Sequence, residues 1–296
     1  MTPSPDPDDR SEESPKDRFV TVYGRKPVLE ALADPALEVD KVVLAEGVDP
    51  RAARAFHEAA SARGVPVRRA SAQRVKVLAG NGRQDQGVLA DVVAPAMRTI
   101  ERFLAELDGA GGAGGAGGVG GVNGGGAGAG VVVLDGVTTP ANVGMILRSA
   151  TAAGLEGVLL PRRGVPGIDP LVVKASAGVA FHAPVLRAGT AAAGLAALAD
   201  AGFLLLGLDG APTTPSLFDA DLPDRVALVV GGETEGLSDD VRGELHGTVA
   251  IPMAGPVESL NAACAATVAC FELARRRAAA ATALRQESGF PGTQCP

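Results

Sequence analysis

Short apolar runs alternate with amphipathic segments in the first third of the chain, as expected for an α/β domain. Asp49 is placed to cap a helix whose first residue is Pro50. The pattern predicts strands and helices, in chain order, at residues 41–45 (strand), 50–62 (helix), 65–67 (strand), 71–79 (helix) and 87–93 (strand). These elements predict a small domain that spans residues 19–108.

A second and longer alternation begins at residue 131. Strands are predicted at residues 131–134, 157–160, 203–208, 225–230 and 248–251, with helices at 143–153, 190–200, 238–244 and 259–281. The strands are continuous apolar runs, which is typical of a parallel sheet that is covered on both faces. Open sheets of this kind bind ligands in the loops that follow their strands. We therefore expect a second domain over residues 131–282, with its site on those loops.

Three segments lack a pattern that could form a core. Residues 1–18 are charged, rich in Pro and poor in apolar side chains, so they are predicted to be a disordered tail. In residues 109–130, 14 of 22 positions are Gly, which predicts a flexible linker with a span of roughly 25 Å. Matches to GxGxxG inside this linker follow from its composition and do not indicate a dinucleotide site. Residues 283–296 are predicted to be a flexible tail.

Composition narrows the class of protein. A hydrophobic fraction of 46% supports a large core, whereas the 3% of aromatic residues and the lack of Trp leave few platforms for base stacking. The three cysteines have neither a disulfide framework nor a metal-ligand spacing, so we expect no metal and a reducing cytoplasm. No apolar run is long enough to span a membrane, and the first residues do not resemble a secretion signal.

The net charge of −7 argues against a nucleic-acid partner, but the charge is unevenly distributed. Residues 51–98 contain nine basic and three acidic residues, and a basic face can bind phosphate groups on an acidic protein. Two interpretations remain open for this stretch. It could form an RNA-binding patch, or its charges could simply be solvated on helix surfaces.

Three polar segments follow predicted strands and could carry chemistry. They are residues 142–148, which hold Asn142 and Arg148, residues 231–237, which hold Glu233, and residues 251–261. Each residue also has a structural explanation. Asn142 and Ser259 could be helix N-caps, Arg148 a surface arginine, and Glu233 an exposed loop carboxylate. Asn261 is expected inside the first turn of the last helix, where Asn is a poor helix former, so a functional role is favoured there.

In their order and separation, these segments resemble the motifs of the SpoU (TrmH-like) branch of the SPOUT RNA methyltransferases, over residues 131–277. The resemblance implies a mainly parallel α/β domain with a trefoil knot, a homodimer formed through this domain, and ribose 2'-O-methylation with S-adenosylmethionine as methyl donor. Carried over to this chain, it implies that Gly231, Ile251 and Leu260 contact the donor.

The resemblance also implies catalytic roles for Arg148, Asn142, Glu233, Ser259 and Asn261. A guanidinium stays protonated in proteins, so Arg148 is better suited to stabilise an alkoxide or bind a phosphate than to act as a base. The carboxylate of Glu233 could hold Arg148 or order its own loop. Whether Arg148 acts in its own subunit is left open.

Residues 19–93 resemble the substrate-recognition domain, similar to ribosomal protein L30e, of 23S rRNA guanosine 2'-O-methyltransferases. The segment 22–32 and residues 85–88 carry this resemblance. It favours ribosomal RNA as the substrate. The alternatives are a tRNA 2'-O-methyltransferase, an rRNA methyltransferase that confers antibiotic resistance, and an RNA-binding assembly factor without catalytic activity.

Overall fold

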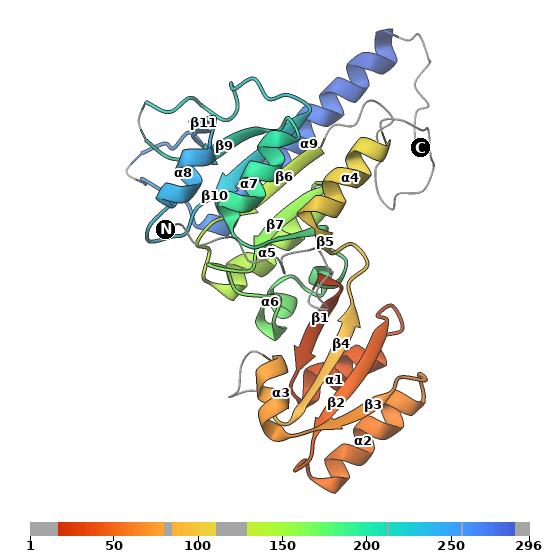
Figure 1. The fold of residues 1–296 in the computed structure, drawn as a ribbon. Helices are drawn as coiled ribbons and strands as arrows, with labels where there is room; N and C mark the ends of the chain where they lie inside the picture. The colour runs from red at the N-terminus through yellow and green to blue at the C-terminus, as the bar shows by residue number, and fades with distance from the viewer. Residues whose placement is uncertain (1–16, 80–84, 111–128, 212, 256, 288–296) are drawn as a thin grey trace, which may run out of the picture. The chain divides into compact units, whose positions relative to one another are not determined.

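The computed structural model describes residues 17–79, 85–110, 129–211, 213–255 and 257–287. The chain divides into two compact units, residues 1–95 and 96–296 (Figure 1). The predicted tail at 1–18 and the predicted tail at 283–296 lie largely outside the described residues, as does most of the predicted linker. Residues 283–287 are described and continue the last helix, so the predicted C-terminal tail starts too early. The remaining parts of these three segments stay predictions.

The first unit is a four-stranded sheet with the order β1-β4-β2-β3. Strand β4 is antiparallel to β1 and to β2, while β3 runs parallel to β2 at the edge of the sheet. Helix α3 packs on one face, around Val75, and helices α1 and α2 are the other helices of the unit. The elements are β1 (Phe19–Tyr23), α1 (Arg25–Ala33), β2 (Val39–Ala45), α2 (Pro50–Ser61), β3 (Val67–Ala70), α3 (Ala72–Ala79) and β4 (Val88–Val93).

Asp49 caps α2 as predicted, since its carboxylate accepts hydrogen bonds from the N–H groups of Arg51 and Ala52. The predicted short strand at residues 65–67 is instead β3, which begins at Val67. Pro66 still takes part in the sheet, because its carbonyl oxygen accepts a hydrogen bond from the N–H of Val42. Pro has no N–H to donate, which suits it to the position before an edge strand.

The second unit is a seven-stranded sheet with the order β11-β9-β10-β6-β7-β8-β5, in which every pair is parallel. Its strands are β5 (Arg98–Thr99), β6 (Ala129–Leu134), β7 (Gly157–Pro161), β8 (Val185–Ala188), β9 (Leu204–Leu208), β10 (Arg225–Val230) and β11 (Gly247–Val249). Its helices are α4 (Ile100–Ala110), α5 (Pro140–Ala152), α6 (Pro170–Ala175), the short 3-10 helix η2 (Val179–Phe181), α7 (Ala191–Asp200), α8 (Asp239–Glu244) and α9 (Ala262–Glu287).

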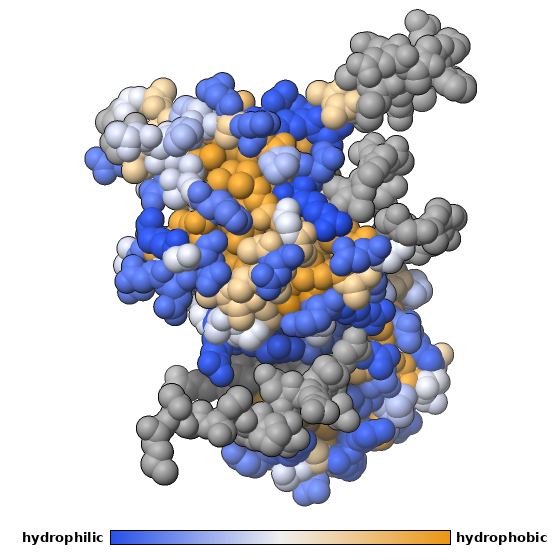
Figure 2. Space-filling view, turned by 45° about the horizontal axis from the view of Figure 1, so that its top comes forward, coloured by the Kyte–Doolittle hydropathy of each residue, from blue (hydrophilic) through white to orange (hydrophobic). Residues whose placement is uncertain are grey.

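Helices cover both faces of this sheet, as the continuous apolar strands predicted. Apolar side chains of α4, α7 and α8 pack in one core cluster with alternate residues of β6, including Val131 and Val133. Val132 and Leu134 point to the opposite face, where α5 and α9 pack on each other and on the strands. Figure 2 shows apolar side chains gathered on the α4 and α7 side of this unit, where several alanines of α7 are partly exposed.

The boundary between the units differs from the predicted one. Strand β5 pairs with β8, and Ile100 and Phe103 of α4 lie in the core of the second unit. Residues 98–110 therefore belong to the second unit, whereas we expected the first domain to extend to residue 108. The amphipathic pattern of α4 shows that it covers a core, but not which of the two cores it covers. Ala129 and Gly130, which we expected in the linker, form the start of β6.

Candidate functional site

Asn142, Glu233 and Asn261 meet in one hydrogen-bonded cluster. They come from the first turn of α5, the loop after β10 and the residue before α9. Oε1 of Glu233 accepts from Nδ2 of Asn142 at 2.6 Å and from Nδ2 of Asn261 at 2.7 Å. Nδ2 of Asn261 also approaches Oδ1 of Asn142 at 3.2 Å. Three segments separated by about 30 to 90 residues of chain thus converge, as the motif resemblance implied.

Asn261 is the N-cap of α9, and this role determines which of its side-chain atoms donates to the cluster. Its Oδ1 accepts from the N–H groups of Ala263 and Cys264, at 2.9 and 3.3 Å. The oxygen must face the helix, so the Nδ2 group must face Glu233. Because the acceptor is a carboxylate, the two bonds from the asparagines to Glu233 are charge-assisted and stronger than neutral ones. The cluster therefore ties the start of α9 to the loop after β10.

The first residues of α5 and α9 differ from the predicted ones, and three predictions are corrected as a result. Helix α5 begins at Pro140, so Asn142 lies inside its first turn and is not the N-cap. The reason is Pro140, whose fixed φ suits the first helical position. Helix α9 begins at Ala262, so Asn261 is the N-cap and is not inside the helix, and Ser259 does not cap it. Ser259 is exposed, and no hydrogen bond of its side chain is found among the described residues.

Gly231 and Gly232 let the loop after β10 fold tightly. The N–H groups and carbonyls of Gly232 and Gly236 bond each other at 3.0 Å. A Cβ on Gly231 would lie 2.4 Å from the carbonyl carbon of Gly236, and one on Gly232 would lie 2.4 Å from the carbonyl oxygen of Gly136. Glycine is thus required at position 231 by the loop's own backbone, independently of the donor contact that the resemblance implies.

The loop before α9, residues 251–261, combines exposed apolar side chains with main-chain N–H and C=O groups that, before Asn261, form no backbone hydrogen bond with the described residues. Ile251 is half-buried, and the exposed apolar residues are Met253, Val257 and Leu260. Within residues 251–255 and 257–260, no backbone hydrogen bond is found to another described residue. Apolar surface beside main-chain donors and acceptors suits an adenine ring, which has apolar faces and a polar edge. Ile251 and Leu260, the expected donor contacts, are thus available to a nucleoside.

Within one chain, Arg148 lies apart from the cluster of Asn142, Glu233 and Asn261. It is the ninth residue of α5 and so lies in the third turn, one turn later than expected from a start at Val143. Asn142 is 3% exposed, whereas Arg148 is exposed and has no ion pair or side-chain hydrogen bond among the described residues. Six helical residues correspond to a rotation of about 240°, so the two side chains leave the helix in different directions. The contact between Glu233 and Arg148 that we considered is not formed in the described chain.

Two further residues support these loops and were missed from the sequence. The carboxylate of Asp135, directly after β6, accepts from the N–H of Ser238 at 2.7 Å and so holds the end of the 231–237 loop. Arg242 of α8 donates to the carbonyl oxygen of Leu237 and to the carboxylate of Asp209, which follows β9. The place of Asp135 just after a buried strand was a usable signal, because loops after such strands form the site.

Some of the basic residues between 51 and 98 have partners within the protein, and others are exposed. The guanidinium of Arg63 donates to four carbonyl oxygens at the end of α1 and in the loop after it, so its role is structural. Arg54 pairs with Glu58, and Arg98 lies in the second unit beside Glu106. The exposed members without an ion pair among the described residues are Arg51, Arg68, Arg69, Arg74 and Lys76. Arg83 lies outside the described residues. Part of the stretch is thus used inside the protein, and the choice between an RNA-binding patch and solvated charges concerns only these five exposed cations.

Within the described ranges, no group of three or more His, Cys, Asp and Glu side chains could hold a metal ion. The described helices include none that is long and apolar enough to cross a bilayer. Of the two described cysteines, Cys264 is exposed and Cys270 is buried in α9. Burial raises the pKa of the Cys270 thiol to about 12, which makes it a packing residue without thiolate chemistry.

Both units match known families. Residues 129–271 match the SpoU rRNA Methylase family, and residues 21–97 match the family described as RNA 2'-O ribose methyltransferase substrate binding. The 23S rRNA (guanosine-2'-O-)-methyltransferase RlmB of Xylella fastidiosa is 34% identical over 256 residues. That alignment covers 86% of this chain and 96% of the relative.

Other relatives align over about half of the chain or share the fold. An uncharacterized tRNA/rRNA methyltransferase of Mycobacterium ulcerans is 42% identical over 147 residues, which is 50% of this chain and 47% of that protein. Among solved structures, the SpoU methyltransferase AviRb from Streptomyces viridochromogenes, in complex with the cofactor AdoMet, superposes with a TM-score of 0.54 at 25% identity. The superposition covers 88% of this chain and 91% of AviRb.

Proposed function

Because this chain belongs to the SpoU rRNA methylase family, we propose that it methylates a ribose 2'-hydroxyl of 23S ribosomal RNA, with S-adenosylmethionine as the methyl donor. The observation that carries the proposal is the cluster of Asn142, Glu233 and Asn261, which joins the three motifs into one site. Alignment over both units with a guanosine-specific 23S rRNA enzyme supports the choice of RNA and of guanosine. A ribosomal RNA substrate also supports a cytoplasmic location for the proposed activity.

Some residues of the site would bind the methyl donor, and others would act on the ribose. S-adenosylmethionine, when bound, supplies a methyl group on a sulfonium centre. The loop with Gly231 and the loop with Ile251 and Leu260 would hold it through main-chain groups and apolar side chains. The cluster would keep these loops in register, and its second carboxylate oxygen, Oε2 of Glu233, accepts no hydrogen bond from the described residues. Arg148 would stabilise the negative charge that develops on the ribose oxygen. Ser259, exposed on the same loop, would contact the RNA.

The direct test is transfer of a labelled methyl group from S-adenosylmethionine to transcripts of 23S rRNA, 16S rRNA and tRNA. Labelling of 23S rRNA at the 2'-oxygen of one guanosine is expected. Labelling of tRNA alone would assign the chain to the tRNA alternative. Binding of RNA without any transfer would assign it to the assembly-factor alternative.

We also propose that two copies of the chain associate through α5 and α9. These helices pack on each other, with Oγ of Ser149 and Oγ1 of Thr267 at 2.8 Å. Each has one large apolar side chain that is exposed, since Met145 of α5 is 41% exposed and Phe271 of α9 is 49% exposed. Exposed apolar side chains grouped in this way indicate an interface. Arg148 is exposed one turn after Met145 on α5, so in such a dimer its guanidinium would face the partner subunit.

A Phe271→Glu change should convert the dimer into a monomer. A buried aromatic anchor contributes about 2 kcal/mol or more to an interface, so the dissociation constant should rise by roughly 30-fold or more. Sedimentation velocity would show a shift toward the chain mass of 29.5 kDa. Val77→Glu is the matched control, because Val77 is 58% exposed but lies on α3 of the first unit. A dimer that tolerates Phe271→Glu as well as Val77→Glu would contradict the interface.

In the first unit, we propose that the edge strand β3 contacts RNA through Arg68 and Arg69. Both arginines are exposed, and neither forms an ion pair among the described residues. The double change Arg68→Glu and Arg69→Glu should weaken RNA binding about tenfold or more. It should also lower the slope of log K against log salt by about two, since each arginine neutralises one phosphate.

The control for this change is Lys26→Glu with Arg54→Glu, which alters the net charge equally. These two cations are already paired, with Glu30 and Glu58 on their own helices. Filter binding over a range of salt concentrations would compare the two double variants. An equal loss of affinity in both would mean that net charge, and not the β3 edge, governs RNA binding.

A further inference from the structure

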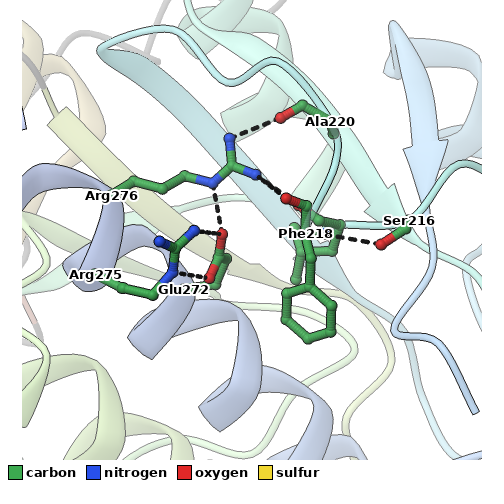
Figure 3. Close-up of polar contacts among 7 residues, drawn as sticks. Ser216, Phe218, Ala220, Glu272, Arg275 and Arg276 are labelled. Atoms are coloured by element: carbon green, nitrogen blue, oxygen red, sulfur yellow. Dashed lines mark hydrogen bonds and ion pairs between the residues drawn. The ribbon is translucent and has the colours of Figure 1, made fainter. Parts of the chain in front are cut away.

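Arg276 of helix α9 holds the loop that follows β9. Its Nη1 donates to the carbonyl oxygen of Ala220 at 2.7 Å, and its Nη2 donates to those of Leu217 and Phe218 at 3.1 and 2.9 Å. Figure 3 shows the guanidinium between the helix and this loop, with its nitrogens directed at the carbonyl groups. One side chain thus satisfies three carbonyls in a stretch of four residues.

The position of this guanidinium is fixed by Glu272, one turn earlier on α9. Oε1 of Glu272 accepts from Nε of Arg276 at 2.6 Å, and the Glu272 side chain is 5% exposed. Hydrogen bonds from Arg275 and then Arg276 hold the pKa of the Glu272 carboxyl below its usual value, although burial opposes this. The carboxylate therefore stays charged and keeps Arg276 aimed at the loop.

The loop held by Arg276 is paired with the segment that leads into Ile251. The N–H of Leu217 donates to the carbonyl oxygen of Ala250 at 2.7 Å, and the N–H of Ala250 donates to that of Pro215 at 2.8 Å. Ala250 directly precedes Ile251, which begins the proposed donor loop. Earlier in the β9 loop, a Cβ on Gly210 would be 3.5 Å from the carbonyl oxygen of Glu258 in the same donor loop.

We propose that Arg276 is a positioning residue for the methyl-donor pocket, an inference that rests on the donor binding proposed above. The guanidinium fixes residues 217–220, and Leu217 of this stretch donates a backbone hydrogen bond to Ala250. Pro215, two residues before Leu217, accepts the second backbone hydrogen bond of Ala250, which sets the start of the donor loop. Arg276 itself would touch neither the donor nor the RNA. Without the Arg276 guanidinium, the donor loop would sample other conformations. The apparent affinity for the donor would then fall in proportion to the fraction of molecules that keep the binding-competent loop.

Arg275 provides a matched control because it is the neighbouring arginine and shares the same carboxylate partner. Its Nε and Nη2 donate to Glu272 at 2.8 Å, but no bond from it to the 217–220 loop is found among the described residues. Its side chain is 62% exposed, against 25% for Arg276. A change at Arg275 removes a cation from the same helix and leaves the contact with the loop in place.

The experiment compares Arg276→Gln with Arg275→Gln in the full chain. Calorimetry would measure the dissociation constant for S-adenosylmethionine, and hydrogen exchange would follow the amides of Leu217 and Ala250. Arg276→Gln should raise the donor dissociation constant about tenfold and speed exchange at both amides. It should raise KM for the donor, with kcat at saturating donor within about twofold of wild type. Arg275→Gln should match wild type in all of these.

Equal donor dissociation constants for Arg276→Gln and Arg275→Gln would overturn the inference and leave the proposed function standing. Failure of the wild-type protein to bind S-adenosylmethionine would overturn the proposed function and, with it, this inference. If Arg276→Gln does not fold, as judged by its circular dichroism and Tm, Arg276→Lys and Arg275→Lys replace the pair. A lysine cannot reach three carbonyls as a planar guanidinium does, so Arg276→Lys should still raise the dissociation constant severalfold. Equality of the two lysine variants would overturn the inference.

Discussion

An Arg148→Ala variant should lose about 10²- to 10³-fold in kcat for methyl transfer, while its Tm stays close to that of wild type. The loss corresponds to removal of one preorganised donor that stabilises a developing oxyanion. The fold should be unaffected because Arg148 is exposed and makes no side-chain hydrogen bond among the described residues. Single-turnover transfer of labelled methyl groups to 23S rRNA would measure the effect on the chemical step.

Arg148→Lys is the informative companion variant. A guanidinium can present two parallel N–H groups to an oxygen and its neighbouring phosphate, whereas an ammonium acts as a point charge. We therefore expect the lysine variant to recover little of the lost rate. Recovery of full activity by lysine would show that charge alone suffices. Undiminished activity of Arg148→Ala would remove Arg148 from the mechanism.

The second large effect is expected at Glu233. Its replacement by Ala removes the acceptor of two amide groups, and Asn142 is 3% exposed, so its Nδ2 loses a partner where water has little access. A hydrogen bond to a charged group contributes about 1.5 to 3 kcal/mol. We expect kcat/KM to fall about 10- to 100-fold, together with weaker binding of S-adenosylmethionine. Steady-state kinetics and calorimetry would measure the two effects.

Glu235→Ala controls for loss of charge in the same loop. Glu235 is exposed, and its side chain has no hydrogen bond or ion pair within the described part of the chain. Its replacement should leave kcat/KM within about twofold of wild type. If both changes act alike, the charge of the loop and not the cluster would explain the loss, and the account of the cluster would be wrong.

The resemblance of three segments to family motifs singled out Asn142, Glu233 and Asn261, and the structure brings these three side chains together. Their catalytic roles stay predictions. The local roles of Asn142 and Asn261 were misjudged, since α5 starts three residues earlier, at Pro140, and α9 starts three residues later, at Ala262, than the apolar pattern indicated. Local periodicity locates a helix, but the capping hydrogen bond sets its first residue.

Strand β8, helix α6 and the unit to which α4 belongs could not be predicted from the pattern of apolar residues alone. Strand β8 has four residues, and helix α6 has six, too few for a clear period. The assignment of α4 depends on Phe103, whose ring lies 6.5 Å from that of Phe203, about 100 residues later. Such pairings, like the one between Arg276 and the 217–220 loop, depend on tertiary structure and leave no trace in local spacing. The trefoil knot and the L30e-like class of the first unit remain predictions.

We expect this chain to place a 2'-O-methyl group on one guanosine of 23S rRNA. The decisive experiment maps 2'-O-methyl sites in rRNA and tRNA, with the gene intact, deleted and restored as wild type or Arg148→Ala. We predict that one 23S rRNA mark disappears on deletion and returns with the wild-type gene but not with the variant. Unchanged rRNA marks in the deletion strain, or loss of a tRNA mark alone, would contradict the claim.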